Sequence, residues 1–200
     1  STGLIDGVTT NPSLMLKAGK DPREVLKQIS DIFPFHASVS AEVVGDTVEE
    51  MLEMADDYIE LGPNITIKVP LTPEGLKVCK DLSSDDVAVN VTLCFSTAQA
   101  ILAAKAGATY VSPFVGRVND QSFDGIKLIE EISDVYATHK QKTQVLAASI
   151  RDVYQVASCF RVGADICTIP SKIFSGMYKH ILTDQGIAKF DEDWTKLVGG

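Results

Sequence analysis

Runs of basic residues are absent from this 200-residue sequence. Lys and Arg number 18 against 27 Asp and Glu, so the formal net charge is −9. A phosphate backbone is bound by clustered Lys and Arg, and we therefore expect no nucleic-acid partner. With 45% hydrophobic residues, 14 Gly and 8 Pro, the composition also excludes fibrous and disordered chains. It predicts one globular domain over residues 1–200.

Cysteine and histidine are scarce, and neither shows the spacing of metal ligands. The cysteines lie in apolar stretches, which is typical of reduced, buried thiols in an intracellular protein. The apolar stretches are short, as at Ala100–Ala104, which ends at Lys105. We therefore expect no metal, no membrane partner and a cytoplasmic protein. The four cysteines are Cys79, Cys94, Cys159 and Cys167.

Short β-like runs alternate with helical segments along the whole chain. This alternation predicts a parallel sheet in one α/β domain. A nucleotide-binding glycine loop does not follow the first run, and polar residues stand near the carboxyl ends of nearly all runs. Both features favour a closed (β/α)8 TIM barrel over an open doubly wound sheet. The runs are Gly7–Thr10, Ala37–Val44, Asn64–Pro70, Val87–Leu93, Thr109–Val115, Thr143–Ser149 and Ala164–Pro170.

Several predicted helices carry their own start and stop signals. Asp21 and Thr72 each precede a proline that suits the first helical position. Thr47 with Glu50, and Ser96 with Gln99, have the spacing of a capping box. Glycines after helical runs, as at Gly107 and Gly163, mark helix ends.

Alternation along the strands predicts which side chains face the barrel axis. In Asn64–Pro70 the apolar residues share the face toward the helices, so Lys68 points inward. The same test turns Ser38, Ser40 and Glu42 inward from the second run, and Asn90 and Thr92 from the fourth. Three neighbouring strands thus direct polar side chains at one space.

Two interpretations of Lys68 remain open from the residues alone. It is either half of a structural ion pair with Glu42 or a nucleophilic amine. Lysine is almost never fully buried without a partner. Burial disfavours an ammonium relative to the free amine, and a free amine attacks ketones to form a Schiff base. The position in a barrel strand favours the Schiff-base interpretation.

Arg117 lies just past the fifth β-like run, and Ser149-Ile-Arg151 closes the sixth. Loops late in a barrel commonly bind phosphate, and arginine with serine supplies the donors that phosphate accepts. The alternative is that each arginine is a solvated residue at a helix start. Because the two arginines follow adjacent strands, an anion site is favoured over this alternative.

Four motifs carry a family resemblance: Gly7-Val-Thr-Thr-Asn-Pro-Ser13, Ile65-Thr-Ile-Lys-Val-Pro70, Asn90-Val-Thr-Leu-Cys-Phe-Ser96 and Ser112-Pro-Phe-Val-Gly-Arg117. They closely resemble the transaldolase family, in its short microbial branch that also contains fructose-6-phosphate aldolases. The resemblance implies a (β/α)8 barrel and class I aldol chemistry with no cofactor. It also implies sugar-phosphate substrates and a homo-oligomer, a decamer or pentamer.

The resemblance also implies roles for individual positions. Lys68 matches the Schiff-base lysine, while Glu42 and Thr92 match the pair that holds a proton-shuttling water. The matches to substrate-binding residues fall into two groups, one for the dihydroxyacetone hydroxyls and one for the phosphate. The first group is Asn11, Asn90 and Ser112, and the second is Arg117, Ser149 and Arg151.

Glu42 and Phe114 distinguish the two activities of this branch. Fructose-6-phosphate aldolases typically have glutamine and tyrosine there, so this sequence resembles a true transaldolase with Phe114 beside the substrate. The expected reaction, in the pentose phosphate pathway, is sedoheptulose 7-phosphate plus glyceraldehyde 3-phosphate giving erythrose 4-phosphate plus fructose 6-phosphate. The alternatives are a fructose-6-phosphate aldolase and a non-catalytic sugar-phosphate-binding barrel.

The family's first strand and its proton-accepting aspartate have no match here. Asp6 precedes the first β-like run and is not assigned that role. A barrel of this kind usually takes about 250 residues, and seven runs are present. We therefore expect the first barrel strand to be missing and the natural protein to begin before Ser1. The sequence also predicts a C-terminal helix at about 185–198.

Overall fold

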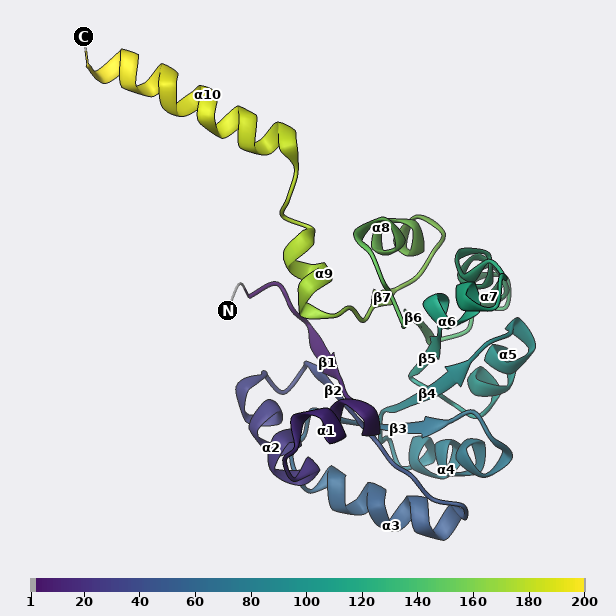
Figure 1. Ribbon diagram of the computed structural model, residues 1–200. Coiled ribbons are helices and arrows are strands. Elements are labelled where there is room, and N and C mark those ends of the chain that lie inside the picture. Colours follow the sequence, from purple (N-terminus) through teal and green to yellow (C-terminus); the bar gives the residue numbers. More distant parts are fainter. Residues whose placement is uncertain (1–2, 200) are drawn as a thin grey trace.

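The computed structural model describes residues 3–199, which form seven strands and ten helices (Figure 1). The strands are β1 Gly7–Thr9, β2 Ser38–Glu42, β3 Ile65–Pro70, β4 Val89–Cys94, β5 Tyr110–Pro113, β6 Gln144–Ala147 and β7 Ile166–Cys167. The helices are α1 Pro12–Ala18, α2 Pro22–Ile32, α3 Val48–Ile59, α4 Pro73–Ser84, α5 Thr97–Lys105, α6 Val115–Asp120, α7 Gly125–Thr138, α8 Val153–Arg161, α9 Ser171–Gly176 and α10 Ile181–Val198.

The strands form one parallel sheet in sequential order, β1 to β7. The sheet is curled, and α2, α3, α4, α5, α7 and α8 surround its outer side (Figure 1). The hydroxyls of Thr9 in β1 and Thr168 after β7 lie 2.7 Å apart, so the two outer strands approach each other at their carboxyl ends. The predicted barrel-type α/β fold with seven of its strands is confirmed.

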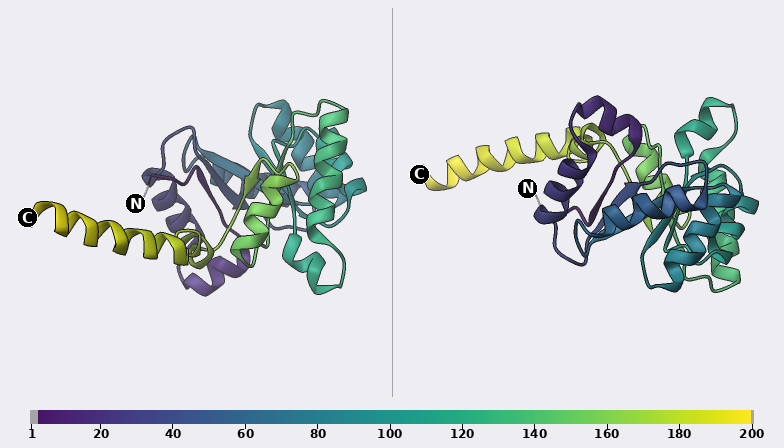
Figure 2. Two further views of the ribbon diagram at one scale, coloured as in Figure 1. Left: turned by 90° about the horizontal axis from the view of Figure 1, so that it is seen from above. Right: turned by 90° about the horizontal axis from the view of Figure 1, so that it is seen from below.

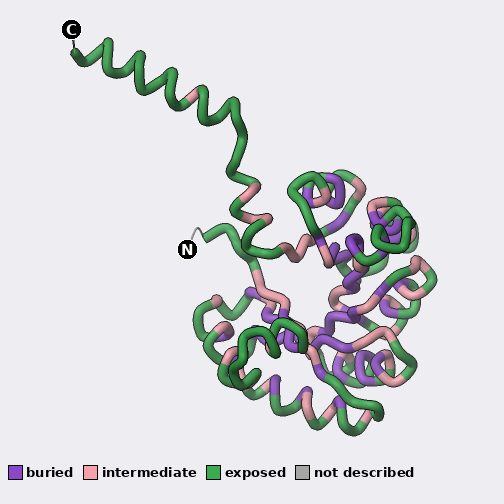
Figure 3. Tube along the Cα trace, in the orientation of Figure 1, coloured by how far each residue is buried: buried purple, intermediate pink, exposed green. Residues whose placement is uncertain are grey.

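Alternating apolar residues of the strands pack under the helices and form the core. Val39, Ile67, Val69, Val89 and Val91 are fully buried. Figure 3 shows burial concentrated in the strands and in the helix faces that cover them. Each such side chain contributes about 1.5–3 kcal/mol through burial. This outward apolar face leaves the opposite face of the sheet for polar residues.

The predicted helix caps are present. The Thr47 hydroxyl accepts from Glu50 N at 3.2 Å, and the Glu50 carboxylate accepts from Thr47 N at 3.2 Å. Ser96 caps α5 through Gln99 N, whereas the Gln99 side chain accepts from Phe95 N instead of completing the predicted box. Gly107 follows α5 with φ +87°, a left-handed conformation that suits glycine.

The predicted runs are longer than the strands at the edge of the sheet. The run at 164–170 forms a regular strand only over β7, where it pairs with β6. The C-terminal helix begins at Ile181, four residues before the predicted 185. His180 caps this start, because its Nδ1 accepts from Leu182 N at 3.2 Å.

Helix α10 projects away from the sheet and its surrounding helices in both views of Figure 2. None of its described side chains is buried. Its exposed apolar residues include Ile187, Phe190, Trp194 and Leu197, which recur at three- and four-residue spacing along one face.

Three of the four cysteines are buried, as predicted, and Cys167 is only partly buried. Burial raises the pKa of the Cys79 and Cys94 thiols to about 12. Among the helices of residues 3–199, none is both long enough and apolar enough to cross a membrane.

Candidate active site

Lys68 lies on the inner face of β3, at the position that strand alternation predicts. Its side chain is 6% exposed, and its Nζ donates to the Glu42 Oε2 at 2.9 Å. It also donates to the backbone carbonyl of Thr10 at 3.1 Å. Glu42 stands directly opposite Lys68 in the β2–β3 register, so the backbone ladder itself sets this ion pair.

The carbonyl that binds Lys68 is itself held in place. Thr10 follows β1, and its hydroxyl donates to the carbonyl of Ser40 in β2 at 2.8 Å. Its backbone N–H donates to the same carbonyl at 3.0 Å. The lysine ammonium therefore sits between a carboxylate and a fixed carbonyl, in surroundings with little water.

A second buried group of polar side chains adjoins Lys68. Asn90 of β4 pairs in register with Lys68, and its Nδ2 donates to the Ser40 hydroxyl at 3.2 Å. The Ser112 hydroxyl of β5 donates to the Asn90 Oδ1 at 2.7 Å. Side chains from β2, β4 and β5 thus join across the inner face; the alternation predicts the inward direction of Ser40 and Asn90. The network fixes the orientation of the Asn90 amide.

Thr92 lies two residues beyond Asn90 in β4 and is fully buried. Its hydroxyl has no hydrogen-bond partner among the described residues. A buried hydroxyl normally has a partner, so this one is available to a water or a ligand. The next residue, Leu93, has φ +60° where the β4–β5 register shifts. Such strained backbone beside polar residues is common at functional sites.

The predicted phosphate residues lie at the same, carboxyl-terminal, end of the sheet. Arg117 in α6 extends over the ring of Phe114, with its guanidinium carbon 4.9 Å from the ring centroid. Phe114 packs against Phe95 with ring centroids 5.6 Å apart. This stacking holds the Arg117 charge by a cation–π contact.

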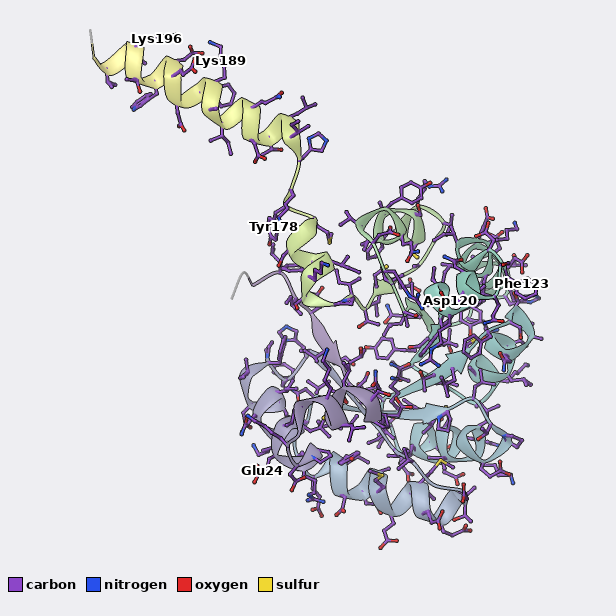
Figure 4. All side chains as sticks on the ribbon, in the orientation of Figure 1. Glu24, Asp120, Phe123, Tyr178, Lys189 and Lys196 are labelled. Carbon is purple, nitrogen blue, oxygen red and sulfur yellow. The ribbon has the colours of Figure 1, made fainter. Side chains whose placement is uncertain are left out.

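Arg151 follows β6 and binds Asp120, the last residue of α6. Its Nη1 donates to the Asp120 Oδ1 at 2.9 Å and its Nη2 to the Oδ2 at 2.5 Å. Arg117, Asp120 and Arg151 line one cavity of about 570 Å³. Figure 4 labels Asp120 and, in the turn before α7, Phe123, which also lines this cavity. The structure therefore brings the two predicted arginines together.

Gly116 allows the start of α6 to pack closely against the loop after β6 that carries Arg151. A Cβ at position 116 would lie 2.2 Å from the Ser149 carbonyl oxygen and 2.7 Å from the Arg151 Nε. The Gly116 N–H donates to the Ser149 carbonyl at 3.1 Å, and Ser149 itself has φ +59°. Ser149 thus lies beside Arg151 where the two segments meet.

Asn11 is placed differently from the other predicted substrate-binding residues. It caps α1, where its Oδ1 accepts from Leu14 N at 2.9 Å. With Thr10 and Glu42 it lines a separate cavity of about 350 Å³ between α1, α2 and α3. Asn11 therefore adjoins the Glu42 side of the site. Asp6, which was not assigned a role, is exposed before β1.

The sequence analysis missed two residues of this arrangement, Thr10 and Asp120. Thr10 acts through its backbone carbonyl, which carries no side-chain signal. Asp120 is 31 residues from its partner Arg151, so no local pattern connects them. Within residues 3–199, no three His, Cys, Asp or Glu side chains are grouped so as to hold a metal ion.

Fold and site together define a class: a barrel-type parallel α/β protein with a buried, ion-paired lysine inside and two arginines at the carboxyl end of the sheet. The whole chain, residues 1–200, matches the family described as Transaldolase/Fructose-6-phosphate aldolase. A protein named "Probable transaldolase" from Paracoccus denitrificans is 52% identical over 97% of this chain and 88% of its own length. The chain therefore belongs to the transaldolase/fructose-6-phosphate aldolase family.

Other relatives agree with this assignment. A "Probable transaldolase" of Cereibacter sphaeroides (strain ATCC 17025 / ATH 2.4.3) is also 52% identical, over 97% of this chain and 88% of its own length. One of Caulobacter vibrioides is 48% identical over the same shares of the two chains.

Proposed function

We propose that this protein is a transaldolase that transfers a dihydroxyacetone unit between sugar phosphates through a Schiff base on Lys68. The observation that carries the proposal is the buried Lys68 Nζ, 2.9 Å from the Glu42 carboxylate. An amine in such surroundings needs one nearby acceptor for its proton before it can attack a ketone, and Glu42 is that acceptor. The family and the printed names of the relatives support this class of reaction.

The proposed cycle begins when the neutral Lys68 amine adds to the C2 ketone of sedoheptulose 7-phosphate or fructose 6-phosphate. Loss of water gives an iminium. The C4 hydroxyl then loses its proton to the water held by Glu42 and Thr92 as the C3–C4 bond breaks, and the electron pair of that bond moves to the iminium nitrogen. The aldose phosphate leaves, and the enamine stays attached until it adds to the next aldehyde. Hydrolysis of the new iminium then releases the product ketose and returns the amine.

The surrounding residues have proposed roles in this cycle. Thr92, with its unpartnered buried hydroxyl, and Glu42 hold the water that carries protons. Asn90, Ser112 and Asn11 bind the hydroxyls of the dihydroxyacetone unit. Arg117, Ser149 and Arg151 bind the phosphate, since arginine forks match phosphate oxygens.

Phe114 supports transaldolase rather than aldolase activity. Its ring contacts Phe95 and the Arg117 guanidinium, and a phenylalanine offers no hydroxyl at this position. A tyrosine there would have a proton to donate to the enamine and would favour release of free dihydroxyacetone. We expect the enamine instead to stay bound until an aldehyde reacts with it.

The cycle belongs in the pentose phosphate pathway and in the cytoplasm.

The Schiff base is tested by borohydride trapping with fructose 6-phosphate. The wild-type protein should gain the mass of a reduced dihydroxyacetone adduct at Lys68, and Lys68→Met should gain none. Lys77→Met, at an exposed lysine on α4, is the matched control and should be trapped like the wild type. Absence of an adduct on wild-type Lys68 overturns the mechanism.

A coupled assay separates the remaining alternatives. A transaldolase turns over fructose 6-phosphate only when an acceptor such as erythrose 4-phosphate is present. A fructose-6-phosphate aldolase releases free dihydroxyacetone without an acceptor. A non-catalytic barrel binds the sugar phosphate and converts none of it.

We also propose that the protein is a homo-oligomer, a pentamer or decamer, with α10 docked on a second copy. The support is the stripe of exposed apolar residues on α10, which buries nothing within its own chain. Sedimentation velocity of Phe190→Glu/Trp194→Glu should show a smaller species than the wild type. Glu192→Ala, on the opposite face of the helix, is the control. A monomeric wild-type protein overturns the proposal.

A further inference from the structure

Asp120 occupies the anion-binding fork of Arg151. Both terminal nitrogens of the guanidinium donate to this one carboxylate, at 2.9 and 2.5 Å. Each terminal nitrogen keeps a second N–H outside this fork, and Nε lies close against Gly116. A phosphate that binds Arg151 through its fork must therefore take the place of Asp120.

We propose that Asp120 is a specificity-determining residue that competes with the substrate phosphate for Arg151. The inference rests on the proposed function, because it takes Arg117 and Arg151 as the phosphate-binding residues. Carboxylate and phosphate both match the planar fork of arginine, so the two anions are true alternatives at one site.

The Arg151–Asp120 ion pair is weak enough for a ligand to displace the carboxylate. The side chains of Arg151 and Asp120 are 51% and 46% exposed, so water and salt screen the pair and its net strength is small. Asp120 also stands at the carboxyl end of α6, where the helix dipole disfavours a negative charge. A phosphate dianion that also contacts Arg117 has the advantage over a single carboxylate.

The same arrangement discriminates between ligands. Against Arg117 and Arg151, Asp120 leaves one net positive charge at the cavity while no ligand is bound. A dianionic phosphate gains from both arginines and displaces Asp120. A neutral sugar offers no charge to replace the carboxylate, so it leaves the pair intact. Asp120 therefore lowers the affinity for phosphorylated ligands and leaves the affinity for neutral ligands unchanged.

Titration calorimetry with inorganic phosphate tests the competition without any turnover. Asp120→Asn removes the competing charge, so we expect the dissociation constant to fall about two- to fivefold, the range spanned by exposed ion pairs. Asp120→Ser should behave in the same way, and it serves if the asparagine variant folds poorly. Asp120→Glu keeps the charge and should stay within about twofold of the wild type.

Asp57→Asn is the matched control. Asp57 forms a similarly exposed ion pair with Arg23, at 2.7 Å between α3 and α2, away from the cavity. Its removal changes the net charge of the protein equally and should leave phosphate binding unchanged. Unchanged or weaker phosphate binding in Asp120→Asn overturns the proposal, as does a wild-type protein that binds no phosphate.

Two further measurements separate competition from a general structural effect. In Asp120→Asn, the KM for fructose 6-phosphate should fall by the same factor as the phosphate dissociation constant, while kcat stays within about twofold. The dihydroxyacetone concentration that gives half-maximal borohydride trapping should not change, because this ligand has no phosphate. If that concentration shifts as well, the proposal is wrong. Failure of trapping in the wild type would instead count against the proposed function.

Discussion

Two ion pairs at the same end of the sheet differ sharply in their surroundings. Lys68 and Glu42 are 6% and 13% exposed and join neighbouring strands in register. Arg151 and Asp120 are about half exposed and join the segment after β6 to the end of α6. Both pairs lie within 3 Å, so distance does not distinguish them.

The comparison teaches that burial, rather than geometry, decides what such a pair does. Removing one partner of a buried pair leaves a charge without solvent or counter-charge, which costs about 3–5 kcal/mol. An exposed pair is worth about 1 kcal/mol or less. The buried pair therefore fixes the position of an amine, and the exposed pair can exchange with a ligand.

The largest expected effect is that of Glu42→Ala. It leaves the Lys68 ammonium with only the Thr10 carbonyl as its partner, so the free energy of unfolding should fall by about 3 kcal/mol or more. Urea denaturation followed by circular dichroism measures the change. A loss below about 1 kcal/mol would be no larger than that expected for a surface ion pair. It would contradict the distinction between the buried and the exposed pair.

Alkaline pH tests how well the Cys94 thiol, at the end of β4, is shielded from water. Burial raises the pKa of Cys94 from its ordinary value of about 9 to about 12. The unfolded thiol ionises first, so its contribution to stability is complete below pH 9 and is lost as the pH rises toward 12. The slope is about 1.4 kcal/mol per pH unit for this thiol. Unfolding measured from pH 8.5 to 10.5 should show a shallower decline in Cys94→Ala than in the wild type.

Asn90→Ala tests the hydrogen-bond network next to Lys68. The Ser112 hydroxyl would lose its buried acceptor, so we expect a loss of about 1–3 kcal/mol in the free energy of unfolding. Gln121→Ala, at an exposed residue lining the arginine cavity, is the control and should change stability by about 0.5 kcal/mol or less. Equal effects at the two positions would contradict the distinction between the buried and exposed regions.

The smallest expected effect is that of Asp120→Asn on stability. The ion pair is half exposed and its carboxylate ends a helix, so the free energy of unfolding should change by about 0.5 kcal/mol or less. Urea denaturation in the absence of phosphate measures it. A loss comparable to that of Glu42→Ala would show that Asp120 is structural and not exchangeable.

Much of the fold and half of the site follow from local patterns. Alternation along β3 turns Lys68 inward, and the same rule on β2 and β4 brings Glu42 and Asn90 to meet it. Caps such as Thr47 with Glu50 depend on contacts three residues apart. These patterns were predictable because a strand or a helix turn fixes the directions of its own side chains.

Other features were not predictable from the sequence. The start of α10 at Ile181 depends on a histidine cap, which is not among the usual capping residues. Strand β7 covers only two residues of the run at 164–170, where the chain pairs with β6. The place of Asn11 in a separate cavity depends on how α1 lies against α2 and α3.

The sequence by itself determined the barrel-type alternation, the inward lysine and the two arginines at the ends of adjacent strands, because strand parity and helix capping are local. Only the tertiary structure decided that Arg151 is already bound by Asp120 and that the Thr10 carbonyl holds Lys68. Those contacts join residues 31 and 58 positions apart, across loops and strands. Their existence depends on how the sheet curls and where its loops meet.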